Sequence, residues 1–224
     1  KPSDASVSAP SNVSITFADL PLRKSTIDAL NAHGFTSPFP IQEAVLPIAL
    51  SDGDVIGQAK TGTGKTLGFG IPIIERIFAP LDSEWDALEF KGQPQALVVV
   101  PTRELCVQVT KDIAELVGNR GIRVIAVYGG RAFEPQIEAL EQGVEIVVGT
   151  PGRLLDLYRQ GQLKLKNVSR LVLDEAAEML AAEQPTTIQQ WKMSDFAVLA
   201  IPEANEKLVM RGMGAFMKAN CNQC

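Results

Sequence analysis

The 224-residue sequence has few of the residues that cross-link a small protein or bind metal. It has three cysteines, Cys106, Cys221 and Cys224, and one histidine, His33. Three cysteines at these distant positions are too few for a disulfide framework, which favours a reducing, cytoplasmic setting. Cys221 and Cys224 have the spacing of a zinc-ligand pair. No other cysteine lies near them and the histidine is far away in the sequence, so zinc binding is not expected.

Long apolar runs and excess positive charge are also missing. No run of about 18 apolar residues occurs, and the chain does not start with a charged segment followed by an apolar one. Neither a membrane span nor a secretion signal is therefore predicted. The net charge of −5 excludes a generally basic coat for nucleic acid but leaves room for a local basic groove. The first residue is Lys1 rather than Met, which is typical of an excised or processed piece.

The composition is otherwise that of a globular protein. Hydrophobic residues make up 46% and charged residues 21% of the chain, so neither disorder nor a coiled coil is indicated for most of it. The length suits one large α/β domain, or a domain with an appendage. Residues 1–14 are rich in Ser and Pro, which predicts a flexible leader before a domain that starts at residue 15.

The most specific motif is residues 59–66, Ala-Lys-Thr-Gly-Thr-Gly-Lys-Thr. Gly62 and Gly64 permit a tight loop whose backbone N–H groups face an anion, and the positive end of a following helix adds to the attraction. Lys65 can reach the β and γ phosphates of a nucleotide, and Thr66 can offer its hydroxyl to Mg²⁺. These features predict a phosphate-binding loop.

The sequence around this loop supports the interpretation. Residues 54–58 predict a strand that enters the loop, and residues 67–78 predict a helix that leaves it. The general pattern has Gly at the first position, where this chain has Ala59. The alternative is a Gly-rich turn with an incidental lysine, which the order of strand, loop and helix disfavours.

Strands and helices alternate along the rest of the chain. The β-branched run 96–100 is typical of a strand buried on both faces of a parallel sheet. Further strands are predicted over 122–128, 144–148 and 171–173, with helices between them. This alternation predicts an α/β fold, a mostly parallel sheet with right-handed crossovers that is flanked by helices on both faces.

The carboxyl ends of these strands carry further candidate site residues, because ligands bind there in open α/β sheets. Asp174 is expected to hold Mg²⁺ through water opposite Thr66, and Glu175 to position or activate an attacking water. The alternative is an acidic cap on a helix that begins at Ala176. The other strands lead into residues 101–105, 129–130 and 150–153.

Gln42 is a candidate for reading a base. Pro40 is expected to open a helix, which holds Gln42 on the first turn, where its amide can offer a paired donor and acceptor to a base edge. Without other motifs, Gln42 would be interpreted as a surface residue of an amphipathic helix.

Together these motifs resemble the amino-terminal RecA-like domain of a DEAD-box RNA helicase, most similar to the bacterial members, over residues 17–180. The resemblance rests on an ordered set: Phe17, Ile41-Gln42, the loop from Ala59 to Thr66, Pro101-Thr102-Arg103-Glu104-Leu105, Gly129-Gly130, Thr150-Pro151-Gly152-Arg153 and Asp174-Glu175-Ala176. The family also has Ala at the first loop position.

The resemblance implies ATP and Mg²⁺ as cofactors and RNA as a partner. Phe17 would stack on adenine, and Gln42 would read its edge and select ATP over GTP. The catalytic residues would be Lys65, Asp174 and Glu175, and Thr66 and Asp174 would hold the metal. Further nucleotide contacts are implied for Ala59, Thr61, Gly62, Thr63, Gly64, Lys65 and Thr66.

The resemblance also implies that a narrow strip grips RNA phosphates and sugars, with little sequence readout. Its residues would be Pro101, Thr102, Arg103, Glu104, Gly129, Gly130, Thr150, Pro151, Gly152 and Arg153. Arg103 and Arg153 would supply the positive charge. Without the family, both arginines are equally well explained as solvated charges at helix starts.

The sequence departs from the family pattern in two ways. Ala177 stands where the Asp-Glu-Ala-Asp signature has its last residue, so a side chain that links the nucleotide site to the next motif is absent. From Ala181 onward the similarity is expected to stop, with no Ser-Ala-Thr motif and no second RecA-like domain. Residues 181–224 are therefore predicted to be a divergent tail, with a candidate strand over 196–201 and a candidate helix over 203–219 of the same domain.

The leading hypothesis is an ATP- and RNA-binding first domain of a DEAD-box helicase, which remodels RNA when paired with a second domain and has little activity alone. One alternative is an inactive regulator that binds RNA or a partner protein, favoured by Ala177 and the tail. The other is a P-loop ATPase that acts on no nucleic acid.

Overall fold

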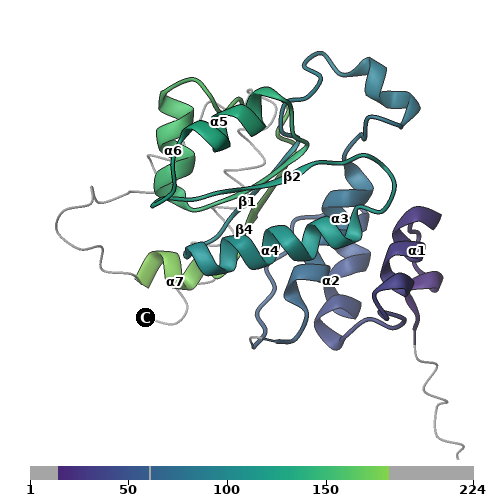
Figure 1. Ribbon diagram of the computed structural model, residues 1–224. Helices are drawn as coiled ribbons and strands as arrows, with labels where there is room; N and C mark the ends of the chain where they lie inside the picture. Colours follow the sequence, from purple (N-terminus) through teal and green to yellow (C-terminus); the bar gives the residue numbers. More distant parts are fainter. Residues whose placement is uncertain (1–14, 61, 182–224) are drawn as a thin grey trace, which may run out of the picture.

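A parallel sheet carries the fold (Figure 1). The computed structural model describes residues 15–60 and 62–181. The strands are β1 (Ala96–Val99), β2 (Val124–Val127), β3 (Ile146–Gly149) and β4 (Arg170–Leu173), and their order in the sheet is β2-β3-β1-β4. Every pair is parallel. The predicted fold class, a parallel α/β sheet, is confirmed.

The positions of the strands in the sheet follow their composition. All four residues of β1 and of β3 are buried, as expected for continuous apolar runs covered on both faces. β4 lies at one edge of the sheet, where Leu171 and Leu173 are each 38% exposed. As far as the described residues go, the sheet therefore has a well-buried centre and a partly exposed edge strand, β4.

Within the described residues, seven α-helices connect or flank the strands, and their starts follow proline and capping signals. Pro40 and Pro151 each occupy the first position of a helix, where the missing N–H is not needed. The helices are α1 (Lys24–Ala32), α2 (Pro40–Leu50), α3 (Lys65–Arg76), α4 (Arg103–Leu116), α5 (Glu134–Glu141), α6 (Pro151–Arg159) and α7 (Ala176–Ala181). Two short 3-10 helices span Phe17–Asp19 and Ser83–Ala87.

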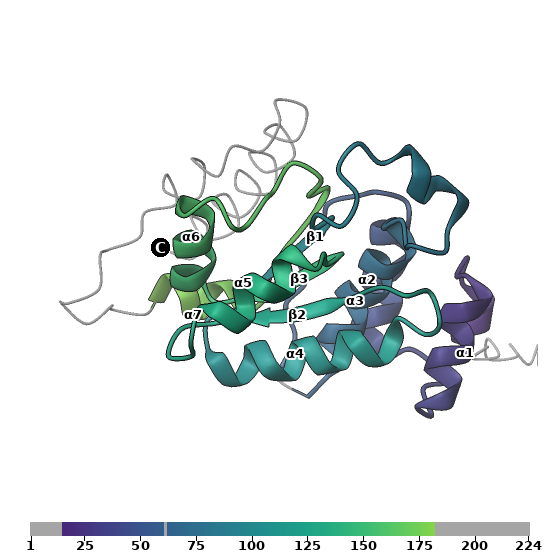
Figure 2. The same cartoon turned by 45° about the horizontal axis from the view of Figure 1, so that its top comes forward.

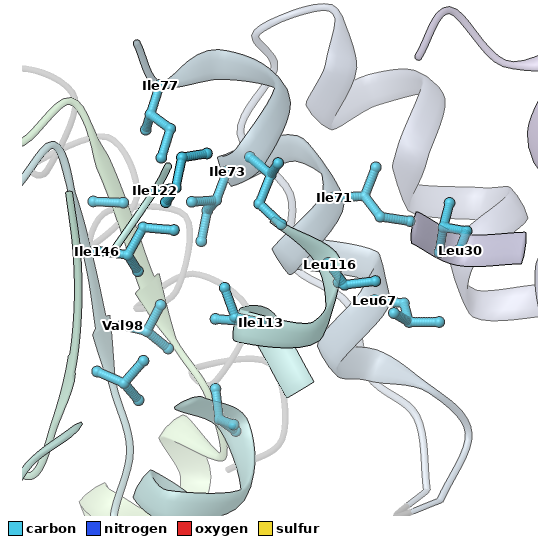
Figure 3. Close-up of a cluster of buried hydrophobic side chains, with 14 of the residues drawn as sticks. Leu30, Leu67, Ile71, Ile73, Ile77, Val98, Ile113, Leu116, Ile122 and Ile146 are labelled. Atoms are coloured by element: carbon cyan, nitrogen blue, oxygen red, sulfur yellow. The ribbon is translucent and has the colours of Figure 1, made fainter. Parts of the chain in front are cut away.

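Helices cover both faces of the sheet, with α4 along one face and α5 and α6 on the other (Figures 1 and 2). Successive strand residues point to opposite faces. Val98 accordingly joins the cluster that includes Ile71 of α3 and Ile113 of α4 (Figure 3), whereas Leu97 joins the cluster that includes Leu157 of α6. The sheet therefore separates two apolar cores.

The strand predicted over residues 54–58 does not form. These residues have no regular secondary structure, and Val55 and Ile56 are 37% and 58% exposed. A strand needs a neighbour for its N–H and C=O groups, and β4, at the edge of the sheet, pairs only with β1 within the described residues. The apolar run is present, but nothing described here pairs with it.

The remaining expectations concern a cysteine, a membrane span, and segments that lie outside the described ranges. Cys106 is fully buried in α4, as predicted, and its burial raises the pKa of the thiol to about 11. Among the described helices, none is long and apolar enough to cross a membrane. The leader 1–14, residue Thr61, and residues 182–224 with the candidate strand 196–201, the candidate helix 203–219, Cys221 and Cys224 lie outside the described residues.

Candidate functional site

The candidate site residues gather at the carboxyl edge of the sheet. Val99, the last residue of β1, is in register with Gly149 of β3 and with Leu173 of β4. The segments that follow these strands therefore leave from one edge. The parallel register brings together motifs that are far apart in the sequence.

The phosphate-loop glycines adopt the conformation for which the sequence predicts them. Gly62 has φ +79° and Gly64 has φ +76°, both in the left-handed region that favours glycine. Thr63 Oγ1 donates to the Lys60 carbonyl oxygen over 2.7 Å, which closes the turn. α3 begins directly after Gly64, so the free N–H groups of its first turn adjoin the loop. This geometry fits a bound phosphate.

Gln42 braces the loop instead of lying on the surface. Its side chain is 1% exposed; its Oε1 accepts from the Phe39 N–H over 2.9 Å and its Nε2 donates to the Gly64 carbonyl oxygen over 2.8 Å. Both ends of the amide are therefore held by backbone groups. The first turn of α2 and the phosphate loop are joined through this one side chain.

Phe17, for which the resemblance implies stacking on adenine, is 2% exposed and packs in the core that contains Leu30 and Ile71. Its stacking on adenine stays a prediction. Phe39 was missed in the sequence. It is 52% exposed, and its Cδ2 would lie 2.9 Å from a Cβ atom on Gly64. The sequence feature that could have pointed to Phe39 is its position directly before Pro40, the first residue of α2.

The three residues predicted to be catalytic do meet. Lys65 Nζ forms an ion pair with Glu175 Oε1, and Asp174 Oδ1 accepts from the Glu175 N–H over 3.0 Å. Glu175 has φ +51°, an unusual value for a residue other than glycine, at the turn after β4. Burial raises the pKa of Asp174, Lys65 opposes this shift and Glu175 adds to it.

The predicted metal ligands fit Mg²⁺ only with help from other groups. Mg²⁺ is usually bound through one or two protein groups plus phosphates and waters, which Thr66 and Asp174 could supply with a nucleotide. No group of three His, Cys, Asp or Glu residues in the described ranges could hold a metal ion. The Thr66 side chain lies near Asp112 of α4, a carboxylate that was missed in the sequence; burial raises the pKa of this carboxyl, whereas Thr66 lowers it.

The three segments predicted to bind RNA form one continuous strip. The Thr150 N–H donates to the Val127 carbonyl oxygen over 3.0 Å, which places the third segment beside the second. The exposed Arg103 guanidinium lies against Gly130, where a Cβ atom would overlap it. Thr102 caps α4, since its Oγ1 accepts from the Leu105 N–H over 3.2 Å. The strip thus runs along the ends of β1, β2 and β3.

Arg153, predicted to offer its charge to RNA, is buried in this strip, and its contact with RNA stays a prediction. It is 8% exposed, its guanidinium lies 3.8 Å from the Phe133 ring centroid, and its Nη2 donates to the Arg131 carbonyl oxygen over 2.9 Å. Arg153 therefore holds the loop after Gly130 in place. Arg131 is exposed and was missed, although it directly follows Gly129-Gly130.

A model of the DEAD/DEAH box helicase family matches residues 39–210 of this sequence. The chain belongs to the DEAD/DEAH box helicase family. The match includes residues 181–210, which were expected from the sequence to lie in a divergent tail.

The relatives of this DEAD-box chain include bacterial proteins. ATP-dependent RNA helicase DeaD of Escherichia coli K12 is 48% identical over 166 residues, which are 74% of this chain and 25% of that protein. DEAD-box ATP-dependent RNA helicase CshA of Streptococcus pneumoniae TIGR4 is 46% identical over 164 residues, 73% of this chain and 29% of that protein. The chain thus spans between a quarter and a third of these relatives.

A solved structure shares the fold. The DEAD box protein from the hyperthermophile Methanococcus jannaschii matches with a TM-score of 0.65 and 41% sequence identity, over 74% of this chain and 42% of that one. The resemblance to a DEAD-box RecA-like domain is therefore confirmed, in both sequence and fold.

The site of this DEAD-box domain combines two surfaces along one edge. The first has backbone donors at Gly62 to Thr66, one lysine and two carboxylates, a set suited to a nucleotide with a cation. The second carries the exposed cations Arg103 and Arg131. Ala177 lies exposed at the start of α7, so this position contributes no carboxylate.

Proposed function

We propose that this chain is the ATP- and RNA-binding first domain of a DEAD-box RNA helicase, which remodels RNA together with a second RecA-like domain. One observation supports this most strongly. The phosphate loop, the Lys65–Glu175 ion pair and the Arg103 strip all lie at the carboxyl edge of one parallel sheet. Family membership supports the same assignment.

The phosphates would be held by the loop and the start of α3. Backbone N–H groups of residues 62–66 offer directed donors, and the helix terminus adds a partial positive charge. Lys65 would exchange its bond to Glu175 for the terminal phosphates. Thr66 and Asp174 would hold Mg²⁺, which when bound neutralises phosphate charge and favours the ionised form of Asp174 despite its burial.

The base would be recognised at the start of α2. Phe39 offers an aromatic ring, half exposed and next to Gly64, and aromatic rings favour stacking on planar bases. Gln42 would read the adenine edge with the second N–H of Nε2 and the second lone pair of Oε1, while its bonds to the Gly64 carbonyl oxygen and the Phe39 N–H stay in place. Base reading and loop position would then be linked through this side chain.

Glu175 would serve the hydrolytic step. Once Lys65 turns to phosphate, the Glu175 carboxylate is free to accept a hydrogen bond from water and orient it toward the terminal phosphate. Asp174 keeps Glu175 in place through the bond from its backbone N–H. Removal of the Glu175 carboxylate is expected to lower hydrolysis more than nucleotide binding.

RNA would lie along the strip at the ends of β1 to β3. Arg103 and Arg131 would contact phosphates, and the first turns of α4 and α6 would add backbone donors. Such contacts carry little sequence information, and they allow a chain with net charge −5 to bind RNA locally. Arg153 would keep the loop that carries Arg131 in position.

The direct test is a titration with fluorescent ADP and GDP in the presence of Mg²⁺. The unaltered chain should bind ADP in preference to GDP, Lys65→Ala should lose binding, and Gln42→Ala should lose the preference. Lys60→Ala is the matched control, since Lys60 is an exposed lysine of the same loop. No binding by the unaltered chain, or equal losses in Lys65→Ala and Lys60→Ala, would overturn the proposal.

A catalytically inactive regulator is the second candidate, and Ala177 favours it. The two functions differ when a second RecA-like domain from a relative is added in trans with RNA. Hydrolysis that rises with the added domain supports the helicase. Retained RNA binding without hydrolysis, followed by hydrolysis in the Ala177→Asp variant, supports the regulator. Nucleotide binding with no RNA binding at all would indicate a P-loop ATPase that acts on no nucleic acid.

A further inference from the structure

A long loop joins α3 to β1. It consists of residues 77–95, between the end of α3 at Arg76 and the start of β1 at Ala96, and contains the short 3-10 helix Ser83–Ala87. Connections in compact domains usually have about 4–6 residues, and much longer ones commonly have a function of their own or are disordered. Figures 1 and 2 show the 77–95 loop standing out from the sheet and its helices.

The 77–95 loop is closed at its neck and braced inside. The Gln95 side chain, 4% exposed, holds both backbone groups of Phe78: its Oε1 accepts from the Phe78 N–H over 2.9 Å and its Nε2 donates to the Phe78 carbonyl oxygen over 2.7 Å. Within the loop, Asp82 forms an ion pair with Arg120, which is buried after the end of α4. Compact surface loops whose ends are held together in this way are frequently functional.

Apolar side chains are exposed on this loop. Leu81 is 75% exposed, more than any other large apolar side chain among the described residues. Phe78 is 36% exposed, and Trp85, in the 3-10 helix, is partly exposed. Aromatic residues are enriched at protein–protein interfaces, and tryptophan is among the residues that contribute most to binding. A braced loop that holds such side chains in water therefore indicates an interaction surface.

The 77–95 loop is also acidic, and half of its four carboxylates are neutralised within the domain. Two of them form ion pairs, Asp82 with Arg120 and Asp86 with Lys91. The other two, Glu84 and Glu89, are exposed and form no ion pair with a described residue. Unpaired negative charge disfavours nucleic acid and anionic lipid as ligands, and it complements a basic polypeptide.

We propose that the 77–95 loop binds a partner protein through a basic segment that carries apolar side chains. Leu81 and Trp85 are the apolar anchors, and Glu84 and Glu89 receive the positive charge. The loop enters β1 at the amino edge of the sheet, whereas the candidate nucleotide and RNA site lies at the carboxyl edge. Strands of four residues separate these edges by about 13 Å. The partner can therefore bind together with nucleotide or RNA, and the proposal depends on neither.

Selection from a library of short random peptides displayed on phage tests the proposal. The full chain is the bait, and Leu81→Ser serves for counter-selection. Enriched peptides are expected to be rich in Lys and Arg, with Leu, Phe or Trp between them. In a chain with Trp191→Phe, Trp85 is the one tryptophan that remains, so its fluorescence reports the binding of a synthesised peptide from the selection.

The expected affinities separate the anchors from the charges. Leu81→Ser should weaken peptide binding by at least about tenfold, since burial of a leucine accounts for much of the affinity. Glu84→Gln combined with Glu89→Gln should weaken binding at low salt by about threefold or more and reduce its salt dependence. The matched controls Ile48→Ser and Glu138→Gln, which change an exposed apolar residue of α2 and an exposed carboxylate of α5, should leave the affinity unchanged.

Several results would overturn the proposal. They include a selection without peptides that depend on Leu81, and enriched peptides that are acidic or uncharged. Equal losses in Leu81→Ser and Ile48→Ser would indicate non-specific adhesion. Displacement of the peptide by RNA would place its site at the carboxyl edge. Self-association of the chain that grows with protein concentration and is lost in Leu81→Ser would assign the loop to a second copy.

The urea midpoint of Leu81→Ser shows whether this variant is intact, and it should equal that of the unaltered chain because Leu81 is mostly exposed. If the midpoint falls, Glu84→Lys combined with Glu89→Lys decides. This charge reversal alters two exposed side chains and should release the basic peptide. Peptide binding that survives the reversal contradicts the proposal.

Discussion

The phosphate loop offers a matched pair of substitutions, Gly62→Ala and Gly64→Ala. Both glycines have nearly the same positive φ, +79° and +76°. Their surroundings differ, since a Cβ atom on Gly62 would meet nothing within 4 Å, whereas one on Gly64 would overlap Gln42 Nε2 and lie 2.9 Å from Phe39 Cδ2. The two variants therefore share a backbone cost, and only Gly64→Ala disturbs the brace.

The expected magnitudes follow from these contacts. An alanine in the left-handed region costs about 1–2 kcal/mol, partly offset by about 0.4–1 kcal/mol from the stiffer unfolded chain, so Gly62→Ala should lower the free energy of unfolding by about 1 kcal/mol. Gly64→Ala also loses the hydrogen bond from Gln42, about 1 kcal/mol, and must displace Phe39. Its total is expected to be about 2–3 kcal/mol.

Urea unfolding measures the difference. The midpoint of Gly64→Ala should lie roughly 0.5 M below that of Gly62→Ala, with similar slopes. In a Gln42→Ala background the difference should shrink, because the brace is already lost. Equal losses in the two glycine variants, or a difference that persists without Gln42, would refute the view that Gln42 ties α2 to the loop.

Three further predictions concern single side chains. Phe39→Ala is expected to weaken ADP binding in calorimetry by about 2- to 13-fold through lost stacking, and to leave binding of inorganic triphosphate unchanged; an equal loss for both ligands would contradict a role in stacking. Burial raises the pKa of Asp112 above its ordinary value of 3.8, so the folded state holds this proton more tightly and ionisation costs stability above the folded pKa. Asp112→Asn should therefore raise the free energy of unfolding at pH 7, and the gain should disappear as the pH falls below 3.8; a gain that is independent of pH would argue against it. Arg103→Ala should weaken RNA binding and reduce its salt dependence by about one contact, whereas Arg153→Leu should lower the free energy of unfolding by about 1–2 kcal/mol, measured by urea titration. If instead Arg153→Leu weakened RNA binding and Arg103→Ala did not, the charge that contacts RNA would be that of Arg153.

The parts of the fold that follow from local sequence were predicted well. The run 96–100 became the buried strand β1, because β-branched residues without polar interruption have few alternatives to the interior of a sheet. Gly62 and Gly64 both adopt positive φ, and Pro40 opens a helix. In each case the residue type restricts its own backbone.

The features that the sequence could not predict concern residues whose surroundings come from distant parts of the chain. Arg153 is buried because Phe133 and the Arg131 carbonyl lie beside it in the fold, and the sequence of α6 contains no sign of them. Phe17 packs beside Leu30 and Ile71, and the residues next to Phe17 in the sequence do not indicate these neighbours. Residues 54–58 have the composition of a strand, but a strand also requires a partner.

The Lys65–Glu175 ion pair couples two events at this edge of the sheet. In the unliganded domain each side chain keeps the other from its proposed task. A ligand that recruits Lys65 must pay for the broken pair and at the same time frees Glu175, so phosphate binding and the availability of a carboxylate for water are thermodynamically linked. Linkage is reciprocal for binding. Any group that binds Glu175 in place of Lys65 would therefore tighten phosphate binding by the factor by which phosphate tightens the binding of that group. The affinity of the domain for phosphate would then depend on the groups that contact Glu175, without a change of fold.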